Sequence, residues 1–245
     1  MAHLPPHPKV RIMSQARMTS SRLPGKIMLE IAGKTMLQHH IERLKKADIP
    51  IIIATTSNTE DDAVEQYAKQ INVDCYRGDE HDVLKRFFEA NEKFQADIIV
   101  RVTSDCPLID GNLIKQGVER YLLLNDSSCY LSNCFPRTYA RGFDFEIFSA
   151  DMLKDAHEQA TSSNDREHVT PFMRNNTQVQ MHNISQTYNH GHLRLTLDTE
   201  DDLNVLKHMM ENTESIRQGY EEIEKTLLAH PEWIAMNAHV EQKKS

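Results

Sequence analysis

The stretch IIIATTSNTEDD, residues 51–62, joins a run of β-branched residues directly to a polar helix start. Ile51 to Thr55 is continuous rather than alternating, which is typical of a strand that is covered on both faces. Thr59 to Asp62 is similar to a capping box that ends in aspartate. A two-faced strand followed at once by a helix is the repeating unit of a parallel sheet with helices on both sides.

The same order of strand and helix recurs on both sides of this stretch. The helix expected at 36–47 has an apolar stripe formed by Met36, Leu37, Ile41 and Leu44. Apolar runs predict further strands at 9–13, 73–76 and 97–103, and helices at 82–94 and 110–124. The alternation predicts an α/β fold with a largely parallel sheet.

The pattern loses its regularity between residues 127 and 192. We expect short strands at 130–132 and 143–148, a helix at 150–160, a polar loop at 161–168 and a further apolar piece at 179–184. The alternation resumes with a strand, LRLTL (193–197), and a helix capped by Thr199; helices at 216–228 and after Pro231 follow. No linker is visible, so we expect one domain over 1–245, with a flexible extension at 1–8, an inserted region at 127–192 and C-terminal helices at 213–245.

Composition excludes several classes of protein. A formal net charge of -8 argues against a dedicated nucleic-acid binder. No apolar run approaches the roughly 20 residues that cross a bilayer, and the amino end does not resemble a signal peptide, so we expect a cytoplasmic protein without membrane contact. The four cysteines form no CxxC pair, which indicates free thiols, and the thirteen histidines show no metal-binding spacing.

A basic loop, QARMTSSRLPGK (15–26), follows the first strand. Ligands of parallel sheets bind beyond the carboxyl ends of the strands, where this loop would lie. Arg17, Arg22 and Lys26 supply positive charge, and Ser20, Ser21 and the backbone near Gly25 supply donors, a combination that suits a triphosphate. The loop is neither a P-loop nor a GxGxxG fingerprint. A plain turn with solvated cations is the alternative.

Two aspartates occupy equivalent positions after apolar strands. Asp105 follows the strand at 97–103, and Asp198 follows the strand at 193–197. They could meet across one cleft and hold a divalent cation, which prefers carboxylate oxygens. Each has a role as a turn or cap residue as its alternative.

Several blocks together resemble a known family. They are QARMTSSRLPGK, ATTSNTEDDA (54–63), RGDEHDVLKRF (77–87), RVTSDCPLID (101–110), REHVTPF (166–172) and RLTLDTEDDL (194–203). The sequence is similar to the CTP-dependent sugar nucleotidyltransferases, especially the spore-coat polysaccharide cytidylyltransferase group, and more distantly to CMP-Kdo and CMP-sialic acid synthetases. The resemblance covers about residues 9–210. It implies a three-layer, Rossmann-like α/β/α nucleotidyltransferase domain with a mostly parallel mixed sheet.

The resemblance also implies an activity: transfer of CMP from CTP to a sugar acid or a phosphorylated acceptor, with release of pyrophosphate, in surface polysaccharide or glycoconjugate biosynthesis. Mg²⁺ would be held by Asp105 and Asp198, and Arg17, Lys26 and Asp105 would be catalytic. Relatives commonly have glycine where this chain has Ser104. Partners would be CTP, a small acceptor and a second copy of the chain, joined through the inserted region.

The implied binding residues fall into three groups. The triphosphate would be held by Ala16, Arg17, Ser20, Arg22 and Lys26. The base and ribose would be lined by Thr55, Thr56, Asn58, Arg77 and Asp82. The acceptor would be faced by Arg141, Asp144, Glu146, Arg166, Glu167 and His168. Ordinary turn, cap and surface roles are the alternatives for the last two groups.

Three competing functions stay open. Asp144-Phe145-Glu146 mimics the D-x-D metal motif of a nucleotide-sugar-dependent glycosyltransferase. Cys106 with His168 could form a hydrolase pair, although the charge of Asp105 would raise the pKa of that thiol. A non-catalytic nucleotide-binding module would bind CTP without releasing pyrophosphate. The sequence does not choose between a 2-keto sugar acid and a phosphate ester as acceptor.

Overall fold

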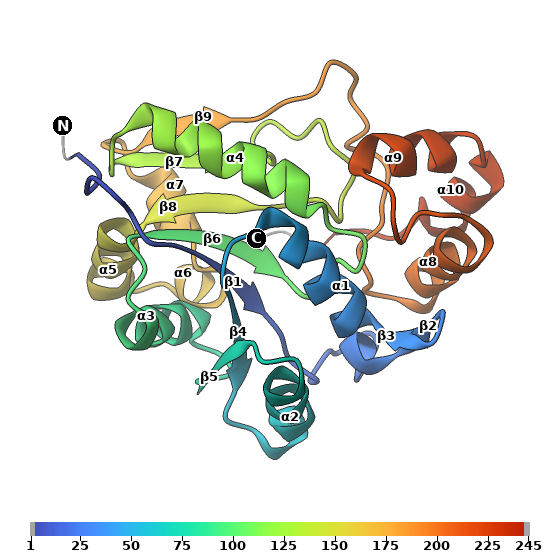
Figure 1. Ribbon diagram of the computed structural model, residues 1–245, viewed down its shortest axis with the longest axis horizontal. Coiled ribbons are helices and arrows are strands. Elements are labelled where there is room, and N and C mark those ends of the chain that lie inside the picture. The colour runs from blue at the N-terminus through green and yellow to red at the C-terminus, as the bar shows by residue number, and fades with distance from the viewer. Residues whose placement is uncertain (1–2, 243–245) are drawn as a thin grey trace.

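A seven-stranded mixed sheet runs through the computed structural model, which describes residues 3–242 (Figure 1). The strand order is β5-β4-β1-β6-β8-β7-β9. The parallel part contains β1 (Val10–Gln15), β4 (Ile51–Thr56), β5 (Asp74–Gly78) and β6 (Ile98–Thr103). The rest of the sheet is formed by β7 (Cys129–Ser132), β8 (Glu146–Ser149) and β9 (Gln180–Asn183). β8 is antiparallel to both β6 and β7, whereas β9 is parallel to β7. The predicted mostly parallel α/β sheet is therefore confirmed.

Alternation along each strand produces two separate cores, one on each face of the sheet. In β4, Ile51 and Ile53 belong to one apolar cluster, whereas Ile52 and Ala54 belong to the other. The first face is covered by α1 (Met36–Leu44), α2 (Asp62–Gln70) and α4 (Gly111–Leu124). The second is covered by α3 (Val83–Phe94), α5 (Ala150–Gln159) and α7 (Pro171–Asn175). Covering both faces explains why β4 is apolar on both sides from Ile51 to Ala54.

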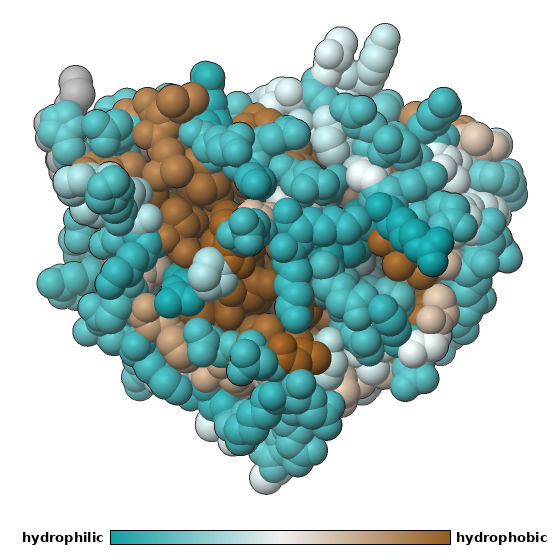
Figure 2. Space-filling view, in the orientation of Figure 1, coloured by the Kyte–Doolittle hydropathy of each residue, from teal (hydrophilic) through white to brown (hydrophobic). Residues whose placement is uncertain are grey.

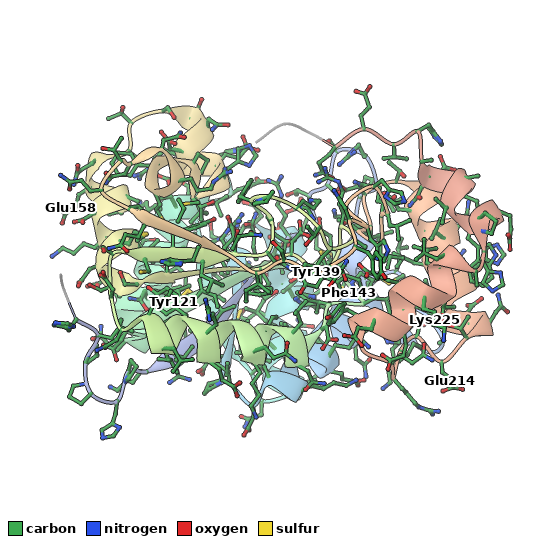
Figure 3. The ribbon with its side chains drawn as sticks, turned by 90° about the horizontal axis from the view of Figure 1, so that it is seen from above. Tyr121, Tyr139, Phe143, Glu158, Glu214 and Lys225 are labelled. Carbon is green, nitrogen blue, oxygen red and sulfur yellow. The ribbon has the colours of Figure 1, made fainter. Side chains whose placement is uncertain are left out.

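The C-terminal helices form a group beside the sheet, at the right of Figure 1. They are α8 (Glu200–Asn212), α9 (Tyr220–Leu228) and α10 (Pro231–Asn237). Figure 3 shows Tyr139 and Phe143 between the sheet and these helices. Both rings pack edge-on against Tyr220, with centroids 5.1 and 6.3 Å away. The two parts of the fold therefore share one continuous apolar cluster.

Small elements complete the chain. β2 (Glu30–Ile31) and β3 (Lys34–Thr35) form a separate hairpin. Single 3₁₀ turns are η1 (Lys26–Met28), η2 (Lys45–Ala47) and η3 (Thr59–Asp61). Residues 1–2 of the expected flexible extension and residues 243–245 of the expected C-terminal helices lie outside the described residues; within the extension, Leu4 is buried.

Three expected elements differ in the structure. The strand at 193–197 is wrong, because only an isolated bridge between Arg194 and Arg141 forms there. The polar loop at 161–168 instead contains a short helix, α6 (Ser163–His168), whose first turn is capped by the Ser162 side chain. The helix expected from 216 begins only at Tyr220.

The surface is mainly polar, as Figure 2 shows, with apolar side chains gathered over the C-terminal end of α4 and on the surface below it. Leu123 in that helix is 81% exposed. Across residues 3–242 we find no helix with the length and apolar character that crossing a membrane requires.

Candidate active site

A cavity of about 370 Å³ lies beyond the carboxyl ends of β1 and β6. Its walls come from the basic loop after β1, the loop after β6, the segment that joins β7 to β8, α6 and α7, and residues 196–198. Gln242 near the end of the chain also lines it. Segments from the whole length of the protein therefore meet at one hollow, as expected for the carboxyl edge of a parallel sheet.

The basic loop is closed by its own backbone. Gly25 adopts a left-handed conformation (φ 68°) and donates its N–H to the Met18 carbonyl at 2.9 Å. Met18 in turn donates its N–H to Asp61 at 2.7 Å, which ties the loop to the end of β4. This turn, which needs glycine at its left-handed position, directs Lys26 inward at the start of η1.

Lys26 joins the two predicted aspartates. Its ammonium lies 2.8 Å from Asp105 Oδ2 and 2.7 Å from Asp198 Oδ1. Although burial alone lowers the pKa of Lys26, the two carboxylates raise it overall. Burial alone raises the pKa of Asp105, but Lys26 and the Thr103 hydroxyl lower it to about 2. Lys26 and Asp105 are therefore charged at neutral pH, and the structure brings the ammonium and both aspartates to one point.

Two arginines extend this cluster. Asp198 Oδ2 accepts from Arg194 at 2.6 Å and lies 3.0 Å from Arg22. Arg194 also binds Asp202 at 2.8 Å, and Asp202 caps α8. Arg194 and Asp202 were not predicted as site residues, although both belong to the RLTLDTEDDL block.

A buried polar network supports the loop that carries Asp105. His40 Nδ1 is 2.9 Å from the Cys106 carbonyl, and His40 Nε2 is 2.8 Å from Ser14 Oγ. Ser14 Oγ is also 2.7 Å from Ser104 Oγ. The serine that replaces the usual glycine at position 104 therefore has hydrogen-bonding partners, which no local sequence signal indicated.

Of the remaining residues predicted for the triphosphate, two line the cavity and one does not. Arg17 and Ser20 line the cavity. Among residues 3–242, Arg17 forms one ion pair, 3.8 Å from Glu80, and its side chain is 36% exposed, so the guanidinium is available to an anion. Ala16 is buried, and its N–H donates to the Ala54 carbonyl at 3.1 Å; it does not line the cavity.

The residues predicted for the base and ribose lie outside this cavity and mostly pair with one another or with neighbours. Thr55 and Thr56 are fully buried, and the Thr56 hydroxyl donates to Asp61. Asn58 donates to Glu80 at 2.6 Å. Arg77 binds Asp62 at 2.5 Å and Glu65 at 3.2 Å. Asp82 caps α3 and accepts from Arg166.

Five of the six residues predicted for the acceptor line the cavity: Arg141, Asp144, Glu146, Glu167 and His168. Arg166 instead binds Asp82 at 2.5 Å and the His157 carbonyl at 2.8 Å. The same wall contains three further cations that were not predicted, Arg101, Arg137 and Arg174.

Asp144 and Glu146, which mimic a D-x-D motif, already accept hydrogen bonds from other side chains of the protein. Asp144 receives two hydrogen bonds from Arg137, at 2.5 and 2.6 Å. Glu146 is buried and accepts from Arg101, Tyr130 and Thr170. Burial, together with Asp105 and Asp144, raises the pKa of the Cys106 thiol well above its usual value. This geometry favours neither a free D-x-D site nor a cysteine nucleophile.

The site's carboxylates suit a divalent cation that a phosphate helps to bind. No group of three histidine, cysteine or acidic side chains in residues 3–242 could hold a metal alone. Asp105 and Asp198, however, both approach one point, which the Lys26 ammonium occupies. Mg²⁺ commonly binds one or two carboxylates together with substrate phosphates, so these residues fit it.

Comparison with known proteins gives consistent results. The profile of a family described as cytidylyltransferase matches residues 12–244. An uncharacterised protein of Methanocaldococcus jannaschii is 34% identical over 234 residues, 94% of each chain. The spore coat polysaccharide biosynthesis protein SpsF of Bacillus subtilis is 28% identical over 203 residues, 79% of this chain and 82% of that protein.

Solved structures with the same fold include known cytidylyltransferases. A cytidylyltransferase from Leptospira borgpetersenii superposes with a TM-score of 0.86 at 33% identity, over 98% of this chain and 100% of that one. A CMP:2-keto-3-deoxy-manno-octonic acid synthetase, solved with CTP, has a TM-score of 0.63 at 20% identity, over 83% of this chain and 99% of that one, and shares the fold.

Proposed function

We propose that this chain, which belongs to the cytidylyltransferase family, transfers CMP from CTP to a small anionic acceptor and releases pyrophosphate. The observation that carries the proposal is the convergence of Lys26, Asp105 and Asp198 on one cavity at the carboxyl edge of the sheet. CTP as the donor is supported by the fold shared with a synthetase that was solved with CTP.

The transfer would proceed by in-line attack of an acceptor oxygen on the α-phosphorus of CTP. The new bond forms between that oxygen and phosphorus, and the bond to the β-phosphate oxygen breaks. Arg17, Arg22 and Lys26 lie where they would oppose the charge that develops on the departing pyrophosphate. Positioning and electrostatics supply most of the acceleration in such reactions.

Asp105 and Asp198 would hold Mg²⁺, which would neutralise phosphate charge as a Lewis acid. Asp105 is oriented for this role by the Thr103 hydroxyl, which donates at 2.6 Å. The carboxylate of Asp198 is oriented by Arg194, which donates to Oδ2 at 2.6 Å. Both carboxylates are therefore held in place by the protein before any ligand binds.

The far wall of the cavity supports a negatively charged acceptor. Arg101, Arg137, Arg141 and Arg174 all line it. A 2-keto sugar acid would offer its carboxylate to these groups, and a phosphate ester would offer its phosphate. Similarity to the spore coat polysaccharide protein supports a role in surface polysaccharide or glycoconjugate synthesis.

The test is a pyrophosphate-release assay that crosses the four nucleoside triphosphates with 2-keto sugar acids and phosphate esters, in the presence of Mg²⁺. We expect activity with CTP, and we expect Asp105→Asn to lower turnover by about 100-fold or more. Asp201→Asn is the matched control, because Asp201 lies in the first turn of α8 but does not line the cavity. Full turnover in Asp105→Asn would refute the metal assignment.

CTP binding by calorimetry without pyrophosphate release from any acceptor would favour the nucleotide-binding module. Release of a nucleoside diphosphate from a sugar nucleotide would favour the glycosyltransferase. Both outcomes would count against the proposed transfer.

A further inference from the structure

The charged cluster at the centre of the site contains equal numbers of positive and negative side chains. Lys26, Arg22 and Arg194 contribute three positive charges, and Asp105, Asp198 and Asp202 contribute three negative ones, linked by contacts of 2.6 to 3.0 Å. Its formal sum is therefore zero, without any ligand.

Lys26 is the member of this cluster that touches both aspartates proposed to hold the metal. Its side chain is only 11% exposed, and its ammonium donates to one oxygen of each carboxylate. Charge-assisted hydrogen bonds of this length are strong, and a small hard cation would seek the same two oxygens. A divalent ion and the Lys26 ammonium therefore compete for one position.

We propose that Lys26 is an internal counter-ion that keeps free divalent cations out of the site until a triphosphate draws its ammonium away, so that metal and nucleotide bind together. This inference rests on the proposed function, because it takes Asp105 and Asp198 as the metal-binding pair.

The displaced ammonium needs a new partner, and a bound triphosphate would provide one. A metal arriving alone would add two positive charges to a neutral cluster and would leave Lys26, largely buried, without its carboxylates. A triphosphate brings several negative charges into the cavity that Arg17 and Arg22 also line. The long lysine side chain can then turn from the aspartates to a phosphate while remaining paired.

Such an exchange couples the two ligands. If the triphosphate improves metal binding by relocating Lys26, the metal must improve nucleotide binding by the same factor. A lysine that only stabilised the fold or bound phosphate would not set this coupling.

The experiment measures Mn²⁺ binding by the full chain, with and without CTP, from the loss of the free-ion resonance signal beyond the loss that the same CTP causes without protein. We expect the wild-type protein to bind Mn²⁺ weakly alone and much more tightly with CTP. Lys26→Met, which keeps the length of the side chain without its charge, should bind Mn²⁺ without nucleotide at least about tenfold more tightly than wild type. It should also lose most of the enhancement by CTP.

Two variants serve as controls. Lys34→Met removes another paired lysine, bonded to Glu42 at 2.6 Å on the separate hairpin, and should leave both affinities unchanged. Adding Asp105→Asn to Lys26→Met should abolish the gain in affinity for Mn²⁺ alone, which shows that the gain arises at this site.

Failure of the inference and failure of the proposed function give different results. If wild type binds Mn²⁺ with CTP through Asp105 but Lys26→Met gains nothing without CTP, the counter-ion role is overturned and the function stands. If neither wild type with CTP nor Lys26→Met alone binds Mn²⁺, the metal site itself is refuted, and the inference falls with it. Loss of affinity in Lys26→Met, with thermal stability retained, would also overturn the counter-ion role.

Discussion

His40 should make this protein sensitive to acid. The imidazole is fully buried, and burial lowers its pKa to about 4, against opposition from the Cys106 carbonyl and the nearby charge of Asp105. Since a carbonyl can only accept, Nδ1–H must donate to Cys106, and Nε2 must accept from the Ser14 hydroxyl. Ser14 then accepts from Ser104. This arrangement requires a neutral ring.

The size of the effect follows from the two pKa values. The unfolded chain takes up this proton near pH 6.5, whereas the folded protein takes it up only near pH 4. Between these values the unfolded state binds more protons, so stability is complete above pH 6.5 and falls as the pH drops towards 4. A difference of about 2.5 units corresponds to about 3 kcal/mol of unfolding free energy.

Urea unfolding at a series of pH values from 7 to 4.5 measures this contribution. His40→Gln removes the titrating group, so its unfolding free energy should fall less steeply with acid than that of wild type, although it starts lower at pH 7. The difference between the two curves cancels all other titrating groups. His81→Gln, an exposed histidine at the start of the α3 segment, is the control. Equal slopes for wild type and His40→Gln below pH 6.5 would refute the assignment of a buried neutral imidazole.

Two further predictions concern stability and reactivity. Gly111→Ala should cost about 2 kcal/mol or more in urea unfolding, because the added Cβ at this buried position would lie 2.4 Å from the Arg43 carbonyl oxygen and 2.8 Å from Ala47 N. Asn112→Ala, at the exposed next position, should cost little, and a neutral Gly111→Ala would contradict the close helix contact. Iodoacetamide at pH 7.5 should leave Cys106 and Cys134 unmodified in the folded protein but alkylate both in urea, because burial raises the pKa of both thiols well above the usual value. Mass spectrometry would detect the labelled cysteines, and rapid labelling of Cys106 in the folded protein would favour a cysteine nucleophile after all.

Local periodicity predicted most of the fold because the apolar patterns of β1, β4 and β6 arise within each strand. The family resemblance is confirmed by the profile match over residues 12–244. The errors lie where a property depends on partners elsewhere. Leu193, Leu195 and Leu197 alternate and are buried, like a strand, but no neighbouring strand pairs with them. The short helix α6 has no buried residue, so its sequence carried no apolar stripe to detect.

The position of Asp198 was predicted for a partly incorrect reason. It was assigned to the end of a sheet strand, yet the residues before it form none. Leu197 N–H instead donates to the Asp105 carbonyl at 2.8 Å, and this bond brings the two aspartates together. The role of His40 could not be found from the sequence, because its partner, the Cys106 carbonyl, is 66 positions away. Arg194 is only four positions before Asp198, so its contact was within reach of a local pattern.

Cations line the cavity of this protein although its net charge is -8, and most of them are paired with carboxylates. Arg101, Arg137 and Lys26 each hold an acidic partner within hydrogen-bonding distance. An anion that approaches these three cations must exchange their acidic partners, and each exchange forfeits an existing ion pair. Under the proposed function, a singly charged anion would therefore gain little there, whereas a triphosphate with its metal would satisfy both the released cations and the released carboxylates. We therefore expect selectivity for a metal-bound nucleotide, even though the protein as a whole repels anions.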